Sequence, residues 1–169
     1  MIHSDNPFGQ ADDATRRLRG RLGSGVTVIT SGSPERPTGL TVSSVVVVAG
    51  APGRVIAVVG PNSDLYDTAI ESGRFIVHVC NQEHSGLADV FAGVRPNPGG
   101  MFAGLSLDDT EWGPSIKSIP TRAYCSAATI EPVGWSGLLT GTIDRVDFDI
   151  DPDPLIYYRG RYRGLPGLE

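Results

Sequence analysis

The sequence has few of the residues that cross-link chains, bind metals or bind nucleic acids. Its two cysteines, Cys80 and Cys125, form neither a CxxC pair nor a cluster with histidine, so we expect free thiols packed in apolar strands and no metal site. Lys117 is the single lysine and the net charge is −5, which argues against the concentrated positive field that a nucleic-acid partner needs.

Long apolar runs are also missing. No segment approaches the roughly 18 apolar residues that span a bilayer, and residues 1–17 contain no apolar signal core. We therefore expect a cytoplasmic protein with no membrane partner.

Glycine and proline, by contrast, are abundant. The 169 residues include 22 Gly and 13 Pro, scattered singly between apolar runs rather than clustered as in a disordered tract. A helical bundle does not tolerate so many helix-breaking residues. The composition predicts one domain of short strands joined by turns.

The predicted elements alternate without a regular strand–helix repeat. Strands are expected within 26–30, 40–48, 55–60, 74–80, 121–133, 137–150 and 154–165, and helices within 12–22, 61–73 and 83–93. This order favours an antiparallel barrel over a doubly wound sheet. The irregular segment 94–120 is rich in Pro and Gly, and a loop of that length predicts a lid over a site.

Two segments offer polar groups for a ligand. Thr41 and Ser43 alternate in a strand and share one face; they are either ordinary strand hydroxyls or the wall of a site for a polar ring system. Gly60–Asp64 ends a strand and begins a helix, so Asn62, Ser63 and free backbone N–H groups either hold a phosphate or only cap the helix. Asp64 opposes a phosphate, and there is no P-loop lysine or GxGxxG motif.

Charged residues with regular spacing have alternative interpretations. The arginines of the first helix and those of the last strand either mark an anionic partner or cofactor or form solvated faces: Arg16, Arg17, Arg19 and Arg21, and Arg159, Arg161 and Arg163. Asp147, Asp149, Asp151 and Asp153 lack calcium-loop spacing and are better explained as a solvated edge. His78 lies in a strand without a GxSxG partner, which favours a satisfied strand histidine over a general base.

Taken together, several segments in order resemble the flavin reductase-like family of FMN-binding split barrels. They are GVTVITSG, then PTGLTVSSVVVVAGAPGRVIAVVGPNSDLYDTAIESGRFIVHVC, then LADVFAG and finally PLIYYRGRY, and the likeness runs from about Leu18 to Tyr162. The resemblance implies a mainly β, six-stranded antiparallel split β-barrel of Greek-key type with a few short helices. It also implies a homodimer, with a tail and short helix over 1–22 and the FMN-binding domain over 23–169.

The resemblance further implies which residues bind the cofactor. In this sequence they are Thr41, Val42, Ser43 and Ser44 along the isoalloxazine and ribityl chain, Asn62, Ser63, Asp64 and Leu65 at the phosphate or ribityl, and Phe91 beside the ring. FMN would lie in a groove beside the subunit interface, near which the C-terminal strand is expected.

The implied reaction is hydride transfer from NADH or NADPH to FMN, with FAD as a possible flavin. The cofactors carry this chemistry, so the chain needs no catalytic triad or metal cluster. Reduced flavin would pass to a partner monooxygenase or another acceptor. Two alternatives remain: a flavin-binding carrier, sensor or partner subunit without turnover, and an oxidoreductase that uses another redox partner such as a deazaflavin.

The sequence departs from the family pattern at one functional turn. Many members have Gly-Asp-His between the last two long strands, with the histidine near the nicotinamide, whereas this chain has Gly134-Trp135-Ser136. Ser136 could donate a hydrogen bond in place of the histidine. Trp135 is expected either to stack on a ring or to be an aromatic residue of the turn. These two residues are the catalytic candidates.

Overall fold

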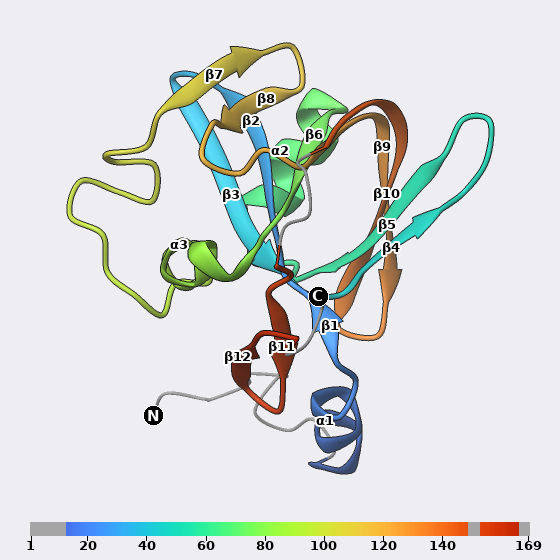
Figure 1. Ribbon diagram of the computed structural model, residues 1–169. Coiled ribbons are helices and arrows are strands. Elements are labelled where there is room, and N and C mark those ends of the chain that lie inside the picture. The colour runs from blue at the N-terminus through green and yellow to red at the C-terminus, as the bar shows by residue number, and fades with distance from the viewer. Residues whose placement is uncertain (1–12, 149–152, 166–169) are drawn as a thin grey trace, which may run out of the picture.

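The main sheet of the protein is antiparallel and curls into a split barrel (Figure 1). The computed structural model describes residues 13–148 and 153–165. The strands of the main sheet are β2 (Thr27–Ser33), β3 (Arg36–Val42), β4 (Val45–Val48), β5 (Arg54–Val59), β6 (Phe75–Val79), β9 (Arg122–Val133) and β10 (Ser136–Asp147). Their spatial order is β3-β2-β6-β9-β10-β5-β4.

Two long strands give the sheet its curvature. The β9–β10 pairing shifts register between Thr140 and Thr142 and again between Ile143 and Arg145, and such irregularities increase local twist. Gly141 lies within the first of these shifts and faces Phe75, where an added Cβ would come 2.5 Å from the ring. A glycine at this position therefore lets the aromatic ring fill the inside of the bend.

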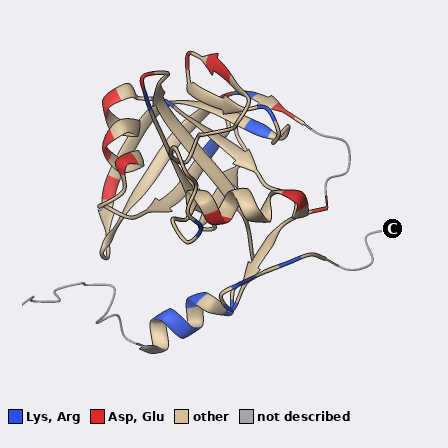
Figure 2. Ribbon diagram, turned by 90° about the vertical axis from the view of Figure 1, so that its left-hand side faces the viewer, with Lys and Arg blue, Asp and Glu red and all other residues tan. Residues whose placement is uncertain are grey.

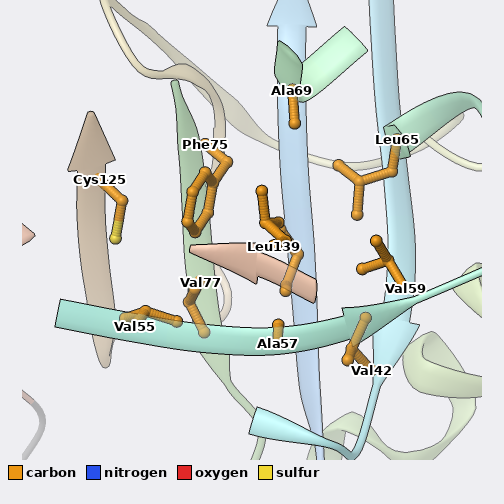
Figure 3. Close-up of a cluster of buried hydrophobic side chains, with 11 residues drawn as sticks. Val42, Val55, Ala57, Val59, Leu65, Ala69, Phe75, Val77, Cys125 and Leu139 are labelled. Carbon is orange, nitrogen blue, oxygen red and sulfur yellow. The ribbon is translucent and has the colours of Figure 1, made fainter. Parts of the chain in front are cut away.

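The barrel interior is apolar (Figure 3). Its buried residues are Ile29, Val42, Val55, Ala57, Val59, Leu65, Ala69, Phe75, Val77, Cys125 and Leu139. Two of them, Leu65 and Ala69, point into the cluster from helix α2 (Asp64–Ser72). Ser63 caps the start of this helix and Gly73 ends it in the left-handed conformation, which confirms the helix predicted over 61–73.

A second apolar cluster lies on the other side of β2. It includes Val28, Phe91 and Ile116, and it brings together α3 (Ser85–Phe91), which follows the 3-10 turn η1 (Gln82–His84), and the hairpin of β7 (Leu107–Thr110) and β8 (Gly113–Ile116). The prediction that 94–120 is irregular throughout was therefore wrong. Apolar residues of this segment, among them Ile116 and Ile119, pack into the second cluster and hold a short hairpin against the barrel.

A small basic unit extends from the barrel at the bottom of Figure 1. It consists of α1 (Asp13–Gly20) and a three-stranded sheet of β1 (Ser24–Gly25), β11 (Ile156–Tyr158) and β12 (Arg161–Arg163), in the order β1-β11-β12. We call residues 13–25 and 156–163 the basic appendage. Its two parts are tied by a backbone hydrogen bond from the Arg159 N–H to the Gly20 carbonyl, 2.8 Å long.

Three expectations for the strands need correction. The run 40–48 is not one strand, because the chain leaves β3 after Val42 and resumes pairing as β4 at Val45. The main sheet consequently has seven strands rather than six. The last predicted strand is a hairpin, with β11 and β12 joined by a two-residue turn at Arg159-Gly160.

None of the described helices is long and apolar enough to cross a membrane.

Candidate functional site

Three adjoining cavities follow β3 along the surface of the barrel. The central cavity, about 860 Å³, is lined by Leu40–Val46 of the β3–β4 segment. A cavity of about 480 Å³ shares Leu40 with it and reaches the start of α2. A third, of about 510 Å³, shares Thr41 and Ser43 with it and extends toward α3. We call these the central, α2-end and α3-side cavities, and together they form one groove.

The break between β3 and β4 exposes the predicted ring-binding segment. Ser43 and Ser44 lie outside both strands, and the Ser44 carbonyl accepts a hydrogen bond from the Val58 N–H at 3.0 Å. Thr41, Val42, Ser43 and Ser44 all line the central cavity, so the structure brings these four together. The Val42 side chain is buried in the barrel, which leaves only its backbone on the groove side.

Thr41 also fixes the neighbouring helix. Its hydroxyl donates to the carbonyl of Ala88 in α3 at 2.6 Å. The hydroxyl is therefore partly committed to holding α3 against β3, and it can offer a ligand only its remaining acceptor capacity.

The α2-end cavity collects the predicted phosphate residues. Asn62, Ser63 and Asp64 line it. The Ser63 hydroxyl donates to the Gly60 carbonyl at 2.8 Å and accepts from the Tyr66 N–H at 3.3 Å. Backbone N–H groups of the first helical turn have no intrahelical acceptor, so those of Asp64 and Leu65 are available at this end. The Leu65 side chain is fully buried and faces the barrel core.

The wall opposite these residues comes from the segment predicted to be a lid. Gly99, Met101 and Phe102 line the α2-end cavity, and Phe102 packs edge-on against Phe91 with ring centroids 5.0 Å apart. The part of 94–120 that borders the groove is thus near its beginning, whereas its hairpin lies elsewhere in the core.

Phe91 lies behind the groove wall. Its ring is fully buried and packs over Gly39, where an added Cβ would come 2.5 Å from Cε1 of the ring. Phe91 lines none of the three cavities. It supports Gly39 and Phe102, which do line the groove, and its direct contact with a flavin ring stays a prediction.

Trp135 lies in the turn between β9 and β10, and Ser136 is the first residue of β10, paired with Val133. Gly137 pairs with Val59, which places this turn beside the Gly60 end of the predicted phosphate loop. Trp135 is 52% exposed, and neither residue lines the groove. Their assignment as catalytic residues stays a prediction.

The groove also contains charged residues that sequence reasoning had not joined to it. Arg16 and Arg19 of α1 and Arg159 of the β11–β12 turn line the central cavity, and Arg161 lines the α3-side cavity. Both arginine series were visible as charge patterns. Their meeting depends on the long-range backbone contact between Arg159 and Gly20, which no local pattern reveals.

The other titratable groups of the barrel are structural. His78 is fully buried; its Nδ1 bonds to the Val28 carbonyl and its Nε2 accepts from the Ile116 N–H, each at 3.0 Å. Burial lowers the pKa of His78 to about 3, which keeps it neutral and confirms the interpretation as a satisfied strand histidine. Burial raises the pKa of the Cys80 and Cys125 thiols to about 12, and both are free cysteines, as expected.

The aspartate series is described only in part. Asp147 accepts hydrogen bonds from the Arg145 guanidinium and the Tyr124 hydroxyl, which lower the pKa of its carboxyl. Asp149 and Asp151 lie outside the described residues. Within residues 13–148 and 153–165, no group of three or more His, Cys, Asp or Glu is placed to hold a metal ion.

The groove has the chemistry that a flavin nucleotide needs. Val46, Ile56 and Leu138 supply apolar surface in the central cavity, Ser43 and Ser44 supply hydroxyls, and the α2 end supplies N–H donors for a phosphate. A concave site of several hundred Å³ with an apolar floor and a few polar groups is typical of cofactor pockets, which span about 300–1,000 Å³. The residues present therefore fit FMN.

Comparison with known proteins identifies the class. The family model for the flavin reductase like domain matches residues 19–166. The chain belongs to the flavin reductase-like family, as the order of its sequence motifs had suggested, and is an oxidoreductase.

Individual relatives cover most of the chain. It is 27% identical over 168 residues to the FMN reductase (NADH) RutF 1 of Methylorubrum extorquens strain PA1, covering 98% of this chain and 83% of that protein. It is 27% identical over 160 residues to HsaB, a reductase subunit of a flavin-dependent monooxygenase from Mycobacterium tuberculosis strain H37Rv, covering 92% and 84%. The structure of flavin reductase PheA2 superposes with a TM-score of 0.81 at 24% identity, covering 91% of this chain and 98% of that one, and thus supports the split-barrel fold.

Proposed function

We propose that the protein is an NAD(P)H-dependent flavin reductase that binds FMN in the groove along β3. The observation that carries the proposal is that the predicted ring segment, Thr41–Ser44, and the start of α2 line two neighbouring cavities that share Leu40. Relatives named as NADH-dependent FMN reductases support the same substrates. FAD and NADPH remain within the proposal.

Each end of the groove has its own task. Asn62, Ser63 and the amides at the start of α2 would bind the flavin phosphate, because the helix N-terminus favours an anion. Ser43, Ser44 and the backbone of β3 would position the ring. The flavin and nicotinamide supply the hydride chemistry when bound, and the protein contributes alignment and shielding from water. Trp135 and Ser136 are proposed to contribute at the nicotinamide side.

We propose that the protein acts as a cytoplasmic homodimer. Val46, Val47 and Val48 of the edge strand β4 and Val58 of β5 are between 39% and 67% exposed. An edge strand with adjacent apolar side chains is usually covered in the functional assembly. Measurement of the molar mass by light scattering tests the homodimer.

Because relatives such as HsaB are subunits of monooxygenases, we also propose a monooxygenase partner as acceptor of reduced flavin.

A blocking substitution tests the location of the site. Ser43 is half-buried and lines both the central and α3-side cavities, so Ser43→Trp should fill the groove. We expect FMN affinity to fall at least about tenfold, by fluorescence titration, with NADH or NADPH oxidation falling in parallel. The control is Ser118→Trp, at an exposed serine that lines none of these cavities.

The outcomes separate the alternatives. Wild-type protein that binds FMN but oxidises neither nucleotide would indicate a flavin-binding module and implicate Trp135 and Ser136. Wild-type protein that does not bind FMN at micromolar concentration would contradict the proposal. Unchanged FMN affinity in the Ser43→Trp variant would show that the site lies elsewhere.

A further inference from the structure

The charges of the protein are segregated (Figure 2). The basic appendage holds seven arginines and only one acidic residue, Asp13, whereas residues 26–148 hold twelve acidic and seven basic residues. In Figure 2 the blue residues mark α1 and the adjacent C-terminal hairpin, and α2 on the barrel is marked in red. A protein of net charge −5 thus concentrates half of its cations in one small unit.

Only part of this charge faces the groove. Arg19 and Arg159 line the central cavity together with Arg16, whereas Arg21 and Arg163 line none of the three cavities. Among residues 13–148 and 153–165, the guanidinium groups of Arg19 and Arg159 form no ion pair or hydrogen bond. Two cations from segments about 140 residues apart therefore face one concave, partly apolar site.

The turn that presents Arg159 is unfavourable for an arginine. Arg159 and Gly160 form the two-residue loop of the β11–β12 hairpin with φ angles of 50° and 77°. Such loops favour Asn or Gly at the first position, because a side chain at positive φ costs of order 1 kcal/mol. An arginine held there, with its N–H bonded to Gly20, is placed at the groove despite this local preference.

These arginines line a different cavity from Asn62 and Ser63, the residues proposed to bind the FMN phosphate. Asn62 and Ser63 line the α2-end cavity, and that cavity shares only Leu40 with the central cavity, where the arginines lie. FMN has one phosphate, and the α2 end provides for it. The arginines of the central cavity are therefore left for a second anionic group.

Resting on the proposed function, we propose that Arg19 and Arg159 form a subsite for the pyrophosphate of a dinucleotide, whether the nicotinamide donor or FAD. Guanidinium groups suit this role because they donate paired hydrogen bonds to phosphate oxygens. An acidic protein partner is the competing occupant. Such a partner would contact arginines across the whole basic appendage, including Arg21 and Arg163, rather than only the two arginines that line the central cavity.

The test compares two double variants with the same change of charge. Arg19→Gln with Arg159→Gln removes the proposed subsite, and Arg21→Gln with Arg163→Gln removes two appendage arginines outside the groove. The binding probe is ADP-ribose, which has the pyrophosphate common to both dinucleotides and no redox ring. We expect its Kd, by calorimetry, to rise about tenfold or more in the first variant. In the second variant we expect the Kd of ADP-ribose to change at most about twofold. We expect the same limit for the Kd of FMN in both variants.

Kinetics then identify the source of the pyrophosphate. A higher KM for NADH or NADPH with unchanged kcat and unchanged FAD affinity assigns the subsite to the nicotinamide dinucleotide. Weaker FAD binding with unchanged FMN binding and unchanged KM assigns it to the flavin.

Other results overturn the subsite. The first is an unchanged ADP-ribose Kd in the Arg19→Gln, Arg159→Gln variant, and the second is no binding of ADP-ribose by the wild type. The third is an equal loss of ADP-ribose affinity in both double variants, which indicates a general surface field or a protein-docking face. Failure of the wild type to bind FMN or oxidise NAD(P)H contradicts the proposed function separately, and the ADP-ribose titration still decides the subsite.

Discussion

The barrel and the basic appendage differ in how completely their side chains are buried. The barrel encloses Phe75, Leu139 and other apolar residues completely, and its buried histidine is hydrogen-bonded on both ring nitrogens. The appendage pairs Tyr157 with Tyr162 at a centroid distance of 5.7 Å, and Tyr157 remains 38% exposed. The difference indicates that burial in the barrel contributes most of the stability, whereas the half-exposed appendage contributes little to it.

The largest expected effect is in the barrel core. Phe75→Ala should lower the free energy of unfolding by about 3–5 kcal/mol, because it empties the space inside the β10 bend. Tyr157→Ala in the appendage should lower it by no more than about 1.5 kcal/mol. Urea unfolding measures both. Similar losses would contradict the assignment of stability to the barrel.

An intermediate effect should appear with pH. His78 has a folded pKa of about 3, below the value near 6.5 expected when unfolded. Its contribution is complete above about pH 6.5 and is lost as the pH falls toward 3, because the unfolded chain then binds a proton that the folded barrel excludes. The loss from this group approaches about 1.4 kcal/mol per pH unit. Urea unfolding of the wild type and of His78→Gln should show a shallower slope in the variant; equal slopes would argue against His78.

The smallest expected effect is in the appendage. Arg19→Gln with Arg159→Gln should change the free energy of unfolding by less than about 0.5 kcal/mol, since both side chains are exposed. Urea unfolding beside the ligand titrations checks this. A loss as large as that of Phe75→Ala would mean that these arginines stabilise the fold.

Local chemistry explains which parts of the fold could be predicted from the sequence. Ser63 and Gly73 act within the helix that they delimit, so its ends were predictable. The break at Ser43-Ser44 follows a continuous β-branched run, and it depends on the Ser44–Val58 contact between separate strands. The Arg159-Gly160 turn was missed because its first residue is not the usual Asn or Gly.

In the site, too, the residues set by local sequence were predictable and those set by distant contacts were not. Motif order placed Thr41–Ser44 and Asn62–Asp64 on the groove, because each segment lies in one continuous stretch. The burial of Phe91 depends on its contact with Gly39, and the position of Arg159 beside the groove depends on its bond to Gly20. Residues whose position depends on partners distant in sequence required the structure.

The buried thiols have a consequence for redox damage. With a pKa of about 12, only about one Cys80 or Cys125 side chain in 100,000 is a thiolate at pH 7. The thiolate is the form that peroxides oxidise to sulfenic acid. Burial thus protects both thiols from the thiolate-dependent route to oxidation.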